Sequence, residues 1–204
     1  MSETVFNVGN EKERRTLWIV LGLNLAIAAG FFATGAVGDS SALIANGLDN
    51  TSDSLVYGIS LFALSRSSKW KRGAANVSGG LLLVFAVGIL IDGWRRYVGG
   101  SEPLGPLMIS MSLVAAVVNL VCIWLLSHLK EPDVNIRAAN TFSLNDFASN
   151  GGILVAGGLV WWLGDSWPDL VVGIAIATIA VWGGIDILRD ARKEHHKVEH
   201  GIEK

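Results

Sequence analysis

The chain is built from long, uninterrupted runs of apolar residues rather than from alternating or amphipathic patterns. Six such runs can be traced, over residues 17–38, 42–64, 74–98, 106–129, 136–163 and 167–188. Roughly 20 apolar residues are enough for a helix to cross the hydrocarbon core of a bilayer. Only helices and closed barrels satisfy their backbone in lipid, and no run alternates with period two. The pattern therefore predicts an all-α integral membrane protein, a bundle of six transmembrane helices.

Composition supports this interpretation, because 51% of the 204 residues are hydrophobic and the mean hydropathy is +0.46. The first run follows a polar stretch, Glu11 to Arg15, and lacks a small-residue cleavage site. We therefore expect a permanent helix there rather than a signal peptide. The single cysteine, Cys122, excludes a disulfide framework.

The distribution of positive charge predicts the orientation of the six helices. Of the 16 Lys and Arg residues, all but Arg95 and Arg96 fall on one side of a six-helix arrangement. By the positive-inside rule, both termini are expected in the cytoplasm. We expect one membrane domain over residues 1–192 and a short, polar cytoplasmic tail over residues 193–204. The net charge of −2 gives no reason to expect a nucleic-acid partner.

Glycine is abundant and clusters inside the apolar runs. Small residues allow membrane helices to approach one another closely, so this pattern favours a compact bundle or a dimer formed by helices. The pairs Gly79–Gly80 and Gly183–Gly184 are candidates for such a dimer interface.

Three aspartates lie deep within the apolar runs, and they are the strongest candidates for function. Asp49 and Asp53 are four residues apart in the second run, so helical geometry places them on one face. Asp146 lies in the fifth run. By the 1.5 Å rise per residue, each is roughly 10–20 Å from a membrane surface. An ionisable residue at such depth costs roughly 2.5–3.5 kcal/mol and usually faces a cavity or an ion path.

Clustered carboxylates repel one another unless a cation lies between them or some are protonated. A divalent cation neutralises them directly, and because ligands must be deprotonated, protons compete with it. The three aspartates therefore predict a metal site suited to metal–proton exchange. Asn24 in the first run could add a neutral oxygen. The alternative is that these residues only form structural hydrogen bonds between helices.

Other polar residues have simpler interpretations. Asp92 is expected to pair with Arg95 and Arg96 at a helix end, and Asn119 is expected to form an interhelical hydrogen bond. Further end-charge pairs and a solvated tail with histidines are expected near the C-terminus, at residues Asp186, Asp190, Arg189, His195, His196 and His200.

Two stretches of the sequence resemble motifs of the cation diffusion facilitators, a family of metal transporters. The first reads Ser41-Ala42-Leu43-Ile44-Ala45 and continues to Asp49-Asn50-Thr51-Ser52-Asp53. The second reads Asn135-Ile136-Arg137-Ala138-Ala139 and continues to Phe142-Ser143-Leu144-Asn145-Asp146. They are similar to the family's Ser-x-Ala-Leu-x-Ala entry, its Arg-Ala pair and its two His/Asp-x-x-x-Asp metal motifs. The likeness follows the six runs in order.

The resemblance implies a transporter rather than an enzyme, a homodimer that exports divalent transition metals, usually by proton antiport. It places a tetrahedral site between the second and fifth helices, with Asp49, Asp53 and Asp146 as ligands. The substrate would be Zn or a related ion such as Co, Cd, Mn or Fe(II), with no prosthetic group. The expected location is a multi-pass position in a bacterial inner or plasma membrane.

The sequence departs from the family pattern at the fourth ligand, where Phe142 stands in place of the usual histidine. The site would then take oxygen from Asn150, Asn145, Asn46, Asn24 or water. Ligation by oxygen alone admits Mn, Fe(II) or Co more readily than a site that contains histidine. The chain ends about 15 polar residues after the sixth run, so the family's cytoplasmic metal-sensing and dimerising domain is not expected.

Two alternatives follow from the same residues. Phe142 would also fit a family member that has lost transport and acts as a scaffold or as a subunit of a hetero-oligomer. An intramembrane aspartyl protease would likewise need two aspartates on different helices, but the Gly-x-Gly-Asp element expected in such enzymes is missing.

Overall fold

The computed structural model describes residues 11–63, 68–128 and 134–199, and the regular structure in these ranges is entirely helical. The helices are α1 (Glu11–Val37), α2 (Ser41–Ala63), α3 (Ser68–Gly99), α4 (Gly105–Ser127), α5 (Val134–Leu163) and α6 (Trp167–Glu199). Each predicted apolar run corresponds to one of them. The prediction of an all-α bundle of six helices is therefore confirmed.

Several helices extend beyond the apolar runs that predicted them. Helix α1 begins at Glu11, and α6 continues to Glu199, well into the segment predicted as a polar tail. A helix satisfies its backbone internally whatever its side chains are, so hydropathy marks the apolar part of each helix and not its ends.

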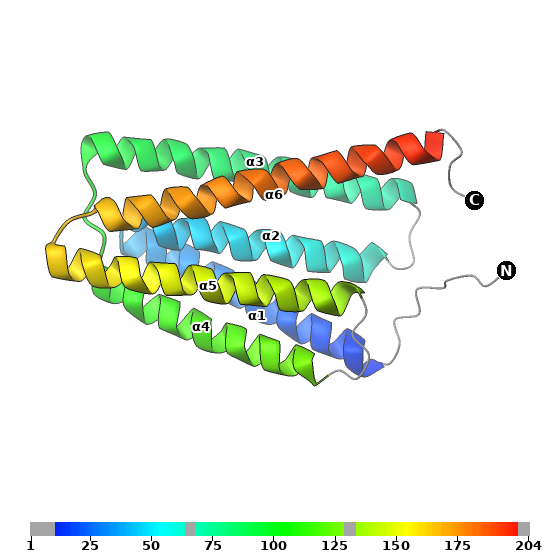
Figure 1. Ribbon diagram of the computed structural model, residues 1–204, viewed down its shortest axis with the longest axis horizontal. Coiled ribbons are helices and arrows are strands. Elements are labelled where there is room, and N and C mark those ends of the chain that lie inside the picture. The colour runs from blue at the N-terminus through cyan, green and yellow to red at the C-terminus, as the bar shows by residue number, and fades with distance from the viewer. Residues whose placement is uncertain (1–10, 64–67, 129–133, 200–204) are drawn as a thin grey trace.

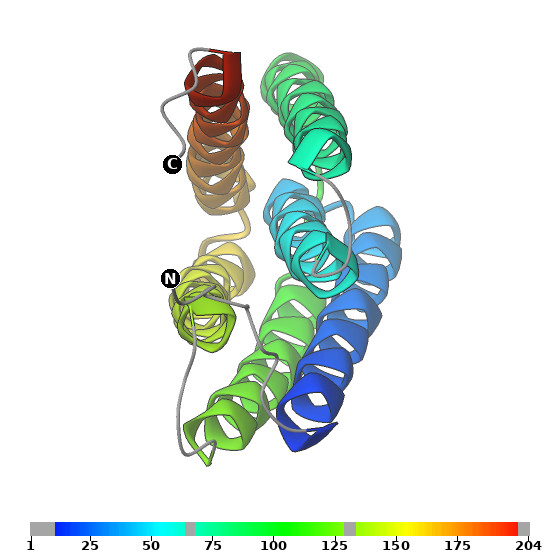
Figure 2. The ribbon, with the colours of Figure 1, turned by 90° about the vertical axis from the view of Figure 1, so that its right-hand side faces the viewer.

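The helices lie side by side along the long axis of the molecule, and α1 starts at the end of the bundle where α6 finishes (Figure 1). Seen along that axis, α2 occupies the middle (Figure 2), where it contacts α1, α3, α5 and α6. Helices α1, α2, α5 and α4 form a closed ring, because each contacts the next and α4 returns to α1. Helices α3 and α6 pack against each other beside this ring.

Glycines permit the closest helix contacts. A Cβ atom added at Gly105 would lie 2.6 Å from the carbonyl oxygen of Gly157, so α4 and α5 touch almost backbone to backbone. A Cβ at Gly184 would lie 2.9 Å from Leu83 Cγ and 3.3 Å from the Gly79 carbonyl oxygen. Gly79 and Gly184, predicted as parts of a dimer interface, therefore serve the contact of α3 with α6 within one chain.

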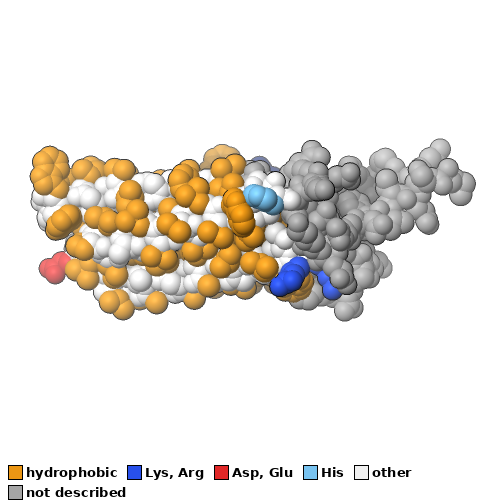
Figure 3. All heavy atoms as spheres, turned by 90° about the horizontal axis from the view of Figure 1, so that it is seen from below, with side chains coloured by type: hydrophobic (Ala, Val, Ile, Leu, Met, Phe, Trp, Pro, Cys, Tyr) orange, Lys and Arg blue, Asp and Glu red, His pale blue; other side chains and the backbone are white. Residues whose placement is uncertain are grey.

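The surface of the bundle is largely apolar. Large hydrophobic side chains are exposed on all six helices. On the face seen in Figure 3 they are spread along the described part of the molecule, with an acidic side chain at the left and Lys or Arg side chains beside the grey atoms at the right. Three stretches of the described residues are long and apolar enough to span a membrane by themselves: Arg14–Val37, Gly105–Ser127 and Trp167–Ile185.

Candidate metal centre

Asp49 and Asp53 face a pocket beside the centre of the bundle. Both carboxylates lie on one face of α2, as their four-residue spacing requires, and both are half-buried. The pocket has a volume of about 470 Å³ and is bounded by α2, α3, α5 and α6. It is lined by Asp49, Ser52, Asp53, Leu82, Asn145, Ala148, Ser149, Ile179, Ala180 and Gly183. Neither aspartate has an ion-pair partner among the described residues.

Helix α5 contributes oxygen donors to this pocket. Asn145, predicted as a possible additional ligand, lines it together with Ser149. These two residues are four apart and therefore share one face of α5. The structure thus brings two carboxylates, an amide and two hydroxyl groups, those of Ser52 and Ser149, to the wall of one pocket. Oxygen donors of this kind suit hard divalent cations.

Asp146 lies on a different side of α5 and does not line the pocket. Successive side chains on a helix differ by about 100°, so Asp146 turns away from Asn145 and into the ring of α1, α2, α4 and α5. It is completely buried, and neither of its carboxylate oxygens has a hydrogen-bond partner among the described residues.

Asp49, Asp53 and Asp146 were expected to surround one metal ion, but their carboxylates do not lie around a single point in this structure. Among the described residues, no three His, Cys, Asp or Glu side chains are grouped closely enough to hold a metal ion. The carboxylates are nevertheless close enough to repel one another, Asp53 with both Asp49 and Asp146, and Asp146 with Asp49. The pair and Asp146 therefore approach one region from two sides.

Two of the predicted amide ligands bind each other. Asn46 Nδ2 on α2 donates a hydrogen bond of 2.8 Å to Asn150 Oδ1 on α5, and both residues are buried. One turn further along α2, Asn50 Nδ2 donates to the Asn46 carbonyl oxygen at 3.0 Å. Asn46 and Asn150 thus tie α2 to α5, which is the structural role that the sequence left open.

The other buried amides have unpaired atoms. Asn24, a predicted additional ligand, is 1% exposed, and neither its Oδ1 nor its Nδ2 has a partner in the described part of the chain. The same is true of Asn119, whose predicted interhelical hydrogen bond is not found there. Asn50 and Ser143 are also buried, each with an oxygen that has no partner among the residues described, and they were not predicted as ligands. Their only signal in the sequence is that they are polar residues within apolar runs.

Several predictions concern side chains that fall outside the described residues. They are those of Phe142, Asp186, Asp190, His195, His196 and His200. Helix α5 includes position 142, but the contacts of the phenylalanine ring are not part of the description.

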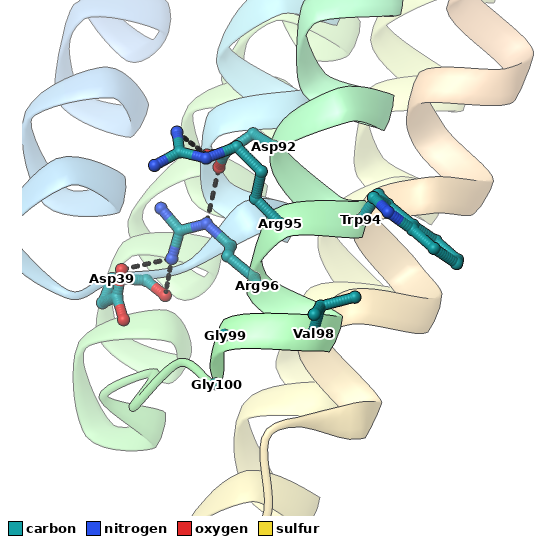
Figure 4. A pocket seen from close by; sticks show the side chains of 8 residues that line it. All are labelled: Asp39, Asp92, Trp94, Arg95, Arg96, Val98, Gly99 and Gly100. Atoms are coloured by element: carbon teal, nitrogen blue, oxygen red, sulfur yellow. Dashed lines mark hydrogen bonds and ion pairs between the residues drawn. The ribbon is translucent and has the colours of Figure 1, made fainter.

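The end of the bundle with the α1–α2, α3–α4 and α5–α6 connections, here called the outer end, is held by ion pairs. Arg96 Nε donates to Asp92 Oδ2 at 2.5 Å, which confirms the predicted end-charge pair. Its Nη1 binds both the carboxylate and the carbonyl oxygen of Asp39, as Figure 4 shows. Asp39 Oδ2 also accepts from the Glu102 amide at 3.0 Å. Arg96 thus connects α3 to the α1–α2 turn.

Asp169 connects the first turn of α6 to the start of α2. Its side chain is completely buried in the first turn of α6. It accepts hydrogen bonds from Ser40 Oγ at 2.5 Å, Ser41 N at 2.7 Å and Ala42 N at 3.1 Å. These amides belong to the start of α2, where backbone donors have no intrahelical partner. Asp169 therefore caps α2 from another helix.

Comparisons with known proteins cover most of the chain. A family model described as the cation efflux transmembrane domain matches residues 17–194. The chain is 23% identical over 190 residues to a "Cadmium, cobalt and zinc/H(+)-K(+) antiporter" of Bacillus subtilis, an alignment that covers 84% of this chain and 61% of the relative. It is 24% identical over 210 residues to "Zinc transporter ZitB" of Escherichia coli, covering 95% of this chain and 66% of the relative.

The chain thus spans less than two thirds of the length of these relatives. The matched domain and the apolar surface of the bundle together identify a multi-pass membrane protein.

Proposed function

The chain belongs to the cation efflux family, and we propose that it carries a divalent metal cation across the membrane in exchange for protons. The observation behind this proposal is the Asp49–Asp53 pair, which faces a pocket of about 470 Å³ deep in an apolar bundle. Two carboxylates without an ion-pair partner at this depth are costly unless a cation neutralises them.

In this proposal, Asp49 and Asp53 hold the ion from α2, while α5 supplies Asn145 and Ser149 on the opposite wall. Asp146 is the third carboxylate, and it reaches the ion when α5 turns or shifts relative to α2. Such a change suits alternating access, in which helices move around a site near the membrane centre. Asn150, Asn46 and Asn24 are the further oxygen donors of the proposal, and Asn150 and Asn46 also tie α2 to α5.

Oxygen donors dominate the pocket, so we propose that the substrates include Mn, Fe(II) or Co in addition to Zn and Cd. Carboxylates and amides are harder ligands than imidazole or thiolate and favour such ions. The relatives' names mention cadmium, cobalt and zinc, which lie within the same class of divalent cations.

The proposal extends to a homodimer that assembles through transmembrane helices. Because Gly79 and Gly184 already serve the contact between α3 and α6, we expect the second copy on an exposed apolar face instead.

Proton exchange follows from the carboxylates of the proposed site. A carboxylate must be deprotonated to bind metal, so metal affinity should fall as the pH is lowered. Isothermal titration at pH 8 and pH 5.5 would measure this.

A binding experiment tests the proposed site directly. Purified protein in detergent is titrated with Mn, Co and Zn while tryptophan fluorescence is recorded, for the wild type, Asp49→Ala and Asp165→Ala. Asp165 is an exposed carboxylate at the outer end, so its variant is a matched control for charge. We expect saturable quenching in the wild type and the control, and its loss in Asp49→Ala. No response to any metal in the wild type would favour a scaffold that has lost transport.

A further inference from the structure

The pocket of Asp49 and Asp53 is larger than a metal ion without water needs. Its volume is about 470 Å³, whereas one water molecule takes up roughly 30 Å³ of the liquid. An octahedral ion with a complete shell of water therefore occupies roughly 180 Å³ by the same measure. The pocket has room for a divalent ion that keeps all or most of its water.

The walls of the pocket offer few ligands to an ion that has lost its water. Side-chain donors come from α2 and α5, whereas α3 and α6 present groups such as Leu82 and Ile179, which have none. Among the described residues, no three His, Cys, Asp or Glu side chains are grouped closely enough to hold a metal ion. Beyond the donors on α2 and α5, the coordination positions of an ion in this pocket are therefore open to water.

Ser52 lines the pocket as a hydrogen-bond acceptor. Its hydroxyl donates a hydrogen bond of 2.9 Å to the Leu48 carbonyl oxygen, one turn back on α2. The single hydrogen of the hydroxyl is therefore used within the helix, and the group has only oxygen lone pairs left to offer. A water molecule on a cation directs a lone pair to the metal and its hydrogens outward. An acceptor such as Ser52 complements metal-bound water.

Helix α5 adds two further oxygens to the wall of the pocket. They are the amide oxygen of Asn145 and the hydroxyl of Ser149, which share one face of α5 because they are four residues apart. Both oxygens can accept hydrogen bonds. Together with the carboxylates of Asp49 and Asp53, they give the pocket acceptors on two helices, as binding the outside of a hydrated ion requires.

We propose that this pocket binds a divalent cation that keeps most of its water shell, and that magnesium is therefore among its ligands. Mg²⁺ loses water reluctantly, and proteins usually bind it through one or two carboxylates and several waters. Asp49 and Asp53 supply the carboxylates, while Ser52, Asn145 and Ser149 accept hydrogen bonds from the bound waters. Zinc instead favours direct ligation with nitrogen or sulfur ligands, and none of the residues that line the pocket has such a side chain.

This inference rests on the proposed function, because it takes the pocket of Asp49 and Asp53 to be the divalent site. It adds a step to that function. The ion enters the pocket with its water, and Asp146 displaces part of this water when α5 moves relative to α2. Selection among divalent ions would then depend on how readily each ion gives up water.

Competition against Mn²⁺ tests the binding of hydrated ions without transport. Mn²⁺ suits the same oxygen ligands as Mg²⁺, and its electron paramagnetic resonance signal reports the free ion during titration of wild-type protein in detergent. The competitors are Mg²⁺ and hexaamminecobalt(III), which cannot exchange its ammonia ligands and so binds only by charge and hydrogen bonds. We expect both to release bound Mn²⁺. Electron spin-echo modulation in D₂O should show about four waters on bound Mn²⁺, the number that two carboxylate ligands leave in an octahedral shell.

Ser52→Ala separates the acceptor from the carboxylates. It should weaken binding of hexaamminecobalt(III) and Mg²⁺ severalfold, because metal-bound water loses a hydrogen-bond partner. Thr51→Ala is the matched control, since Thr51 also donates to a carbonyl oxygen one turn back, that of Gly47 at 2.7 Å, but does not line the pocket. We expect this control to bind as the wild type does. Equal effects of the two substitutions would contradict the role of Ser52.

The outcomes separate this inference from the proposed function. Mn²⁺ binding that depends on Asp49 but shows no water ligands, or that either competitor fails to displace, would overturn the hydrated ion and leave the proposed function intact. Absence of Mn²⁺, Co²⁺ and Zn²⁺ binding in the wild type, or Mn²⁺ binding that Asp49→Ala leaves unchanged, would instead refute the proposed site itself.

Discussion

The outer end and the middle of the bundle differ in whether their aspartate side chains have hydrogen-bond or ion-pair partners. At the outer end, Asp169 accepts three hydrogen bonds and Asp39 is paired with Arg96. In the middle, Asp146 is equally buried but has no hydrogen-bond partner among the described residues. Partnered carboxylates of the first kind hold helices together, whereas a carboxylate of the second kind is open to a cation or a proton, as we propose for Asp146.

Typical free energies of burial and hydrogen bonding support this distinction between partnered and unpartnered aspartates. A charged side chain at the centre of a bilayer costs roughly 2.5–3.5 kcal/mol, and hydrogen bonds to charged groups return roughly 1.5–3 kcal/mol each. The three bonds to Asp169 are enough to offset its burial. Asp146 has no such compensation from the described side chains, so its free energy depends on bound ions or protons.

The largest effect on stability is expected from Asp169→Ala. This change leaves the first amides of α2 and the Ser40 hydroxyl without their acceptor in a buried setting, which should lower the free energy of unfolding by about 3 kcal/mol. Thermal unfolding in detergent, followed by circular dichroism, would measure the loss. An unchanged midpoint would mean that the cap does not stabilise the outer end.

The next largest effect concerns packing near the outer end. Gly157→Ala places a Cβ 2.9 Å from Met108 Cβ and 3.1 Å from the Gly105 carbonyl oxygen, so α4 and α5 must move apart at a cost of about 2 kcal/mol. The neighbouring Gly158→Ala is the matched control, because no atom lies within 4 Å of its added Cβ. Equal stability of the two variants would contradict the close contact of these helices.

A smaller effect, a gain rather than a loss of stability, is expected from a substitution in the middle of the bundle. In metal-free buffer at pH 8, Asp146→Asn should raise the free energy of unfolding by about 1 kcal/mol, because it removes an unpaired buried charge. The same thermal assay, with a chelator present, measures the change. A clear loss of stability would show that Asp146 has a structural partner and that the contrast with Asp169 is wrong.

The smallest effect is expected from Phe142→His, and it is a change in metal preference rather than in protein stability. Phe142→His restores the ligand that the family motif carries, and imidazole favours zinc over manganese. We expect the ratio of zinc to manganese affinity to rise several-fold, measured by competition in the fluorescence titration. An unchanged ratio would mean that position 142 does not face the ion.

Much of the fold could be predicted from the sequence, because each apolar run became one helix and the charge pattern predicted that the start of α1 and the end of α6 lie at the same end of the bundle. The partners of Asp169 could not be predicted. Ser40, Ser41 and Ala42 are more than 120 residues away in the chain, and spacing carries no information about such contacts.

The candidate site was predicted in part. The four-residue spacing correctly placed Asp49 and Asp53 on one face, since that depends on α2 alone. Whether Asp146 shares their pocket depends on the rotation of α5 about its axis, which is fixed by long-range contacts such as Asn46–Asn150 and Gly105–Gly157. Residue spacing within α5 does not determine that rotation, and in the structure Asn145 rather than Asp146 lies on the pocket wall.

Transport of metal into proteoliposomes tests the central claim most directly. Wild-type protein, Asp49→Ala, Asp146→Ala and the control Asp165→Ala are reconstituted at equal density, and uptake of Mn, Co, Fe(II), Zn and Cd is measured under a pH gradient. The account predicts uptake of at least one of these ions by the wild type and the control, and background uptake by the other two variants. Background uptake of all five ions by the wild type, or full uptake by both Asp49→Ala and Asp146→Ala, would contradict it.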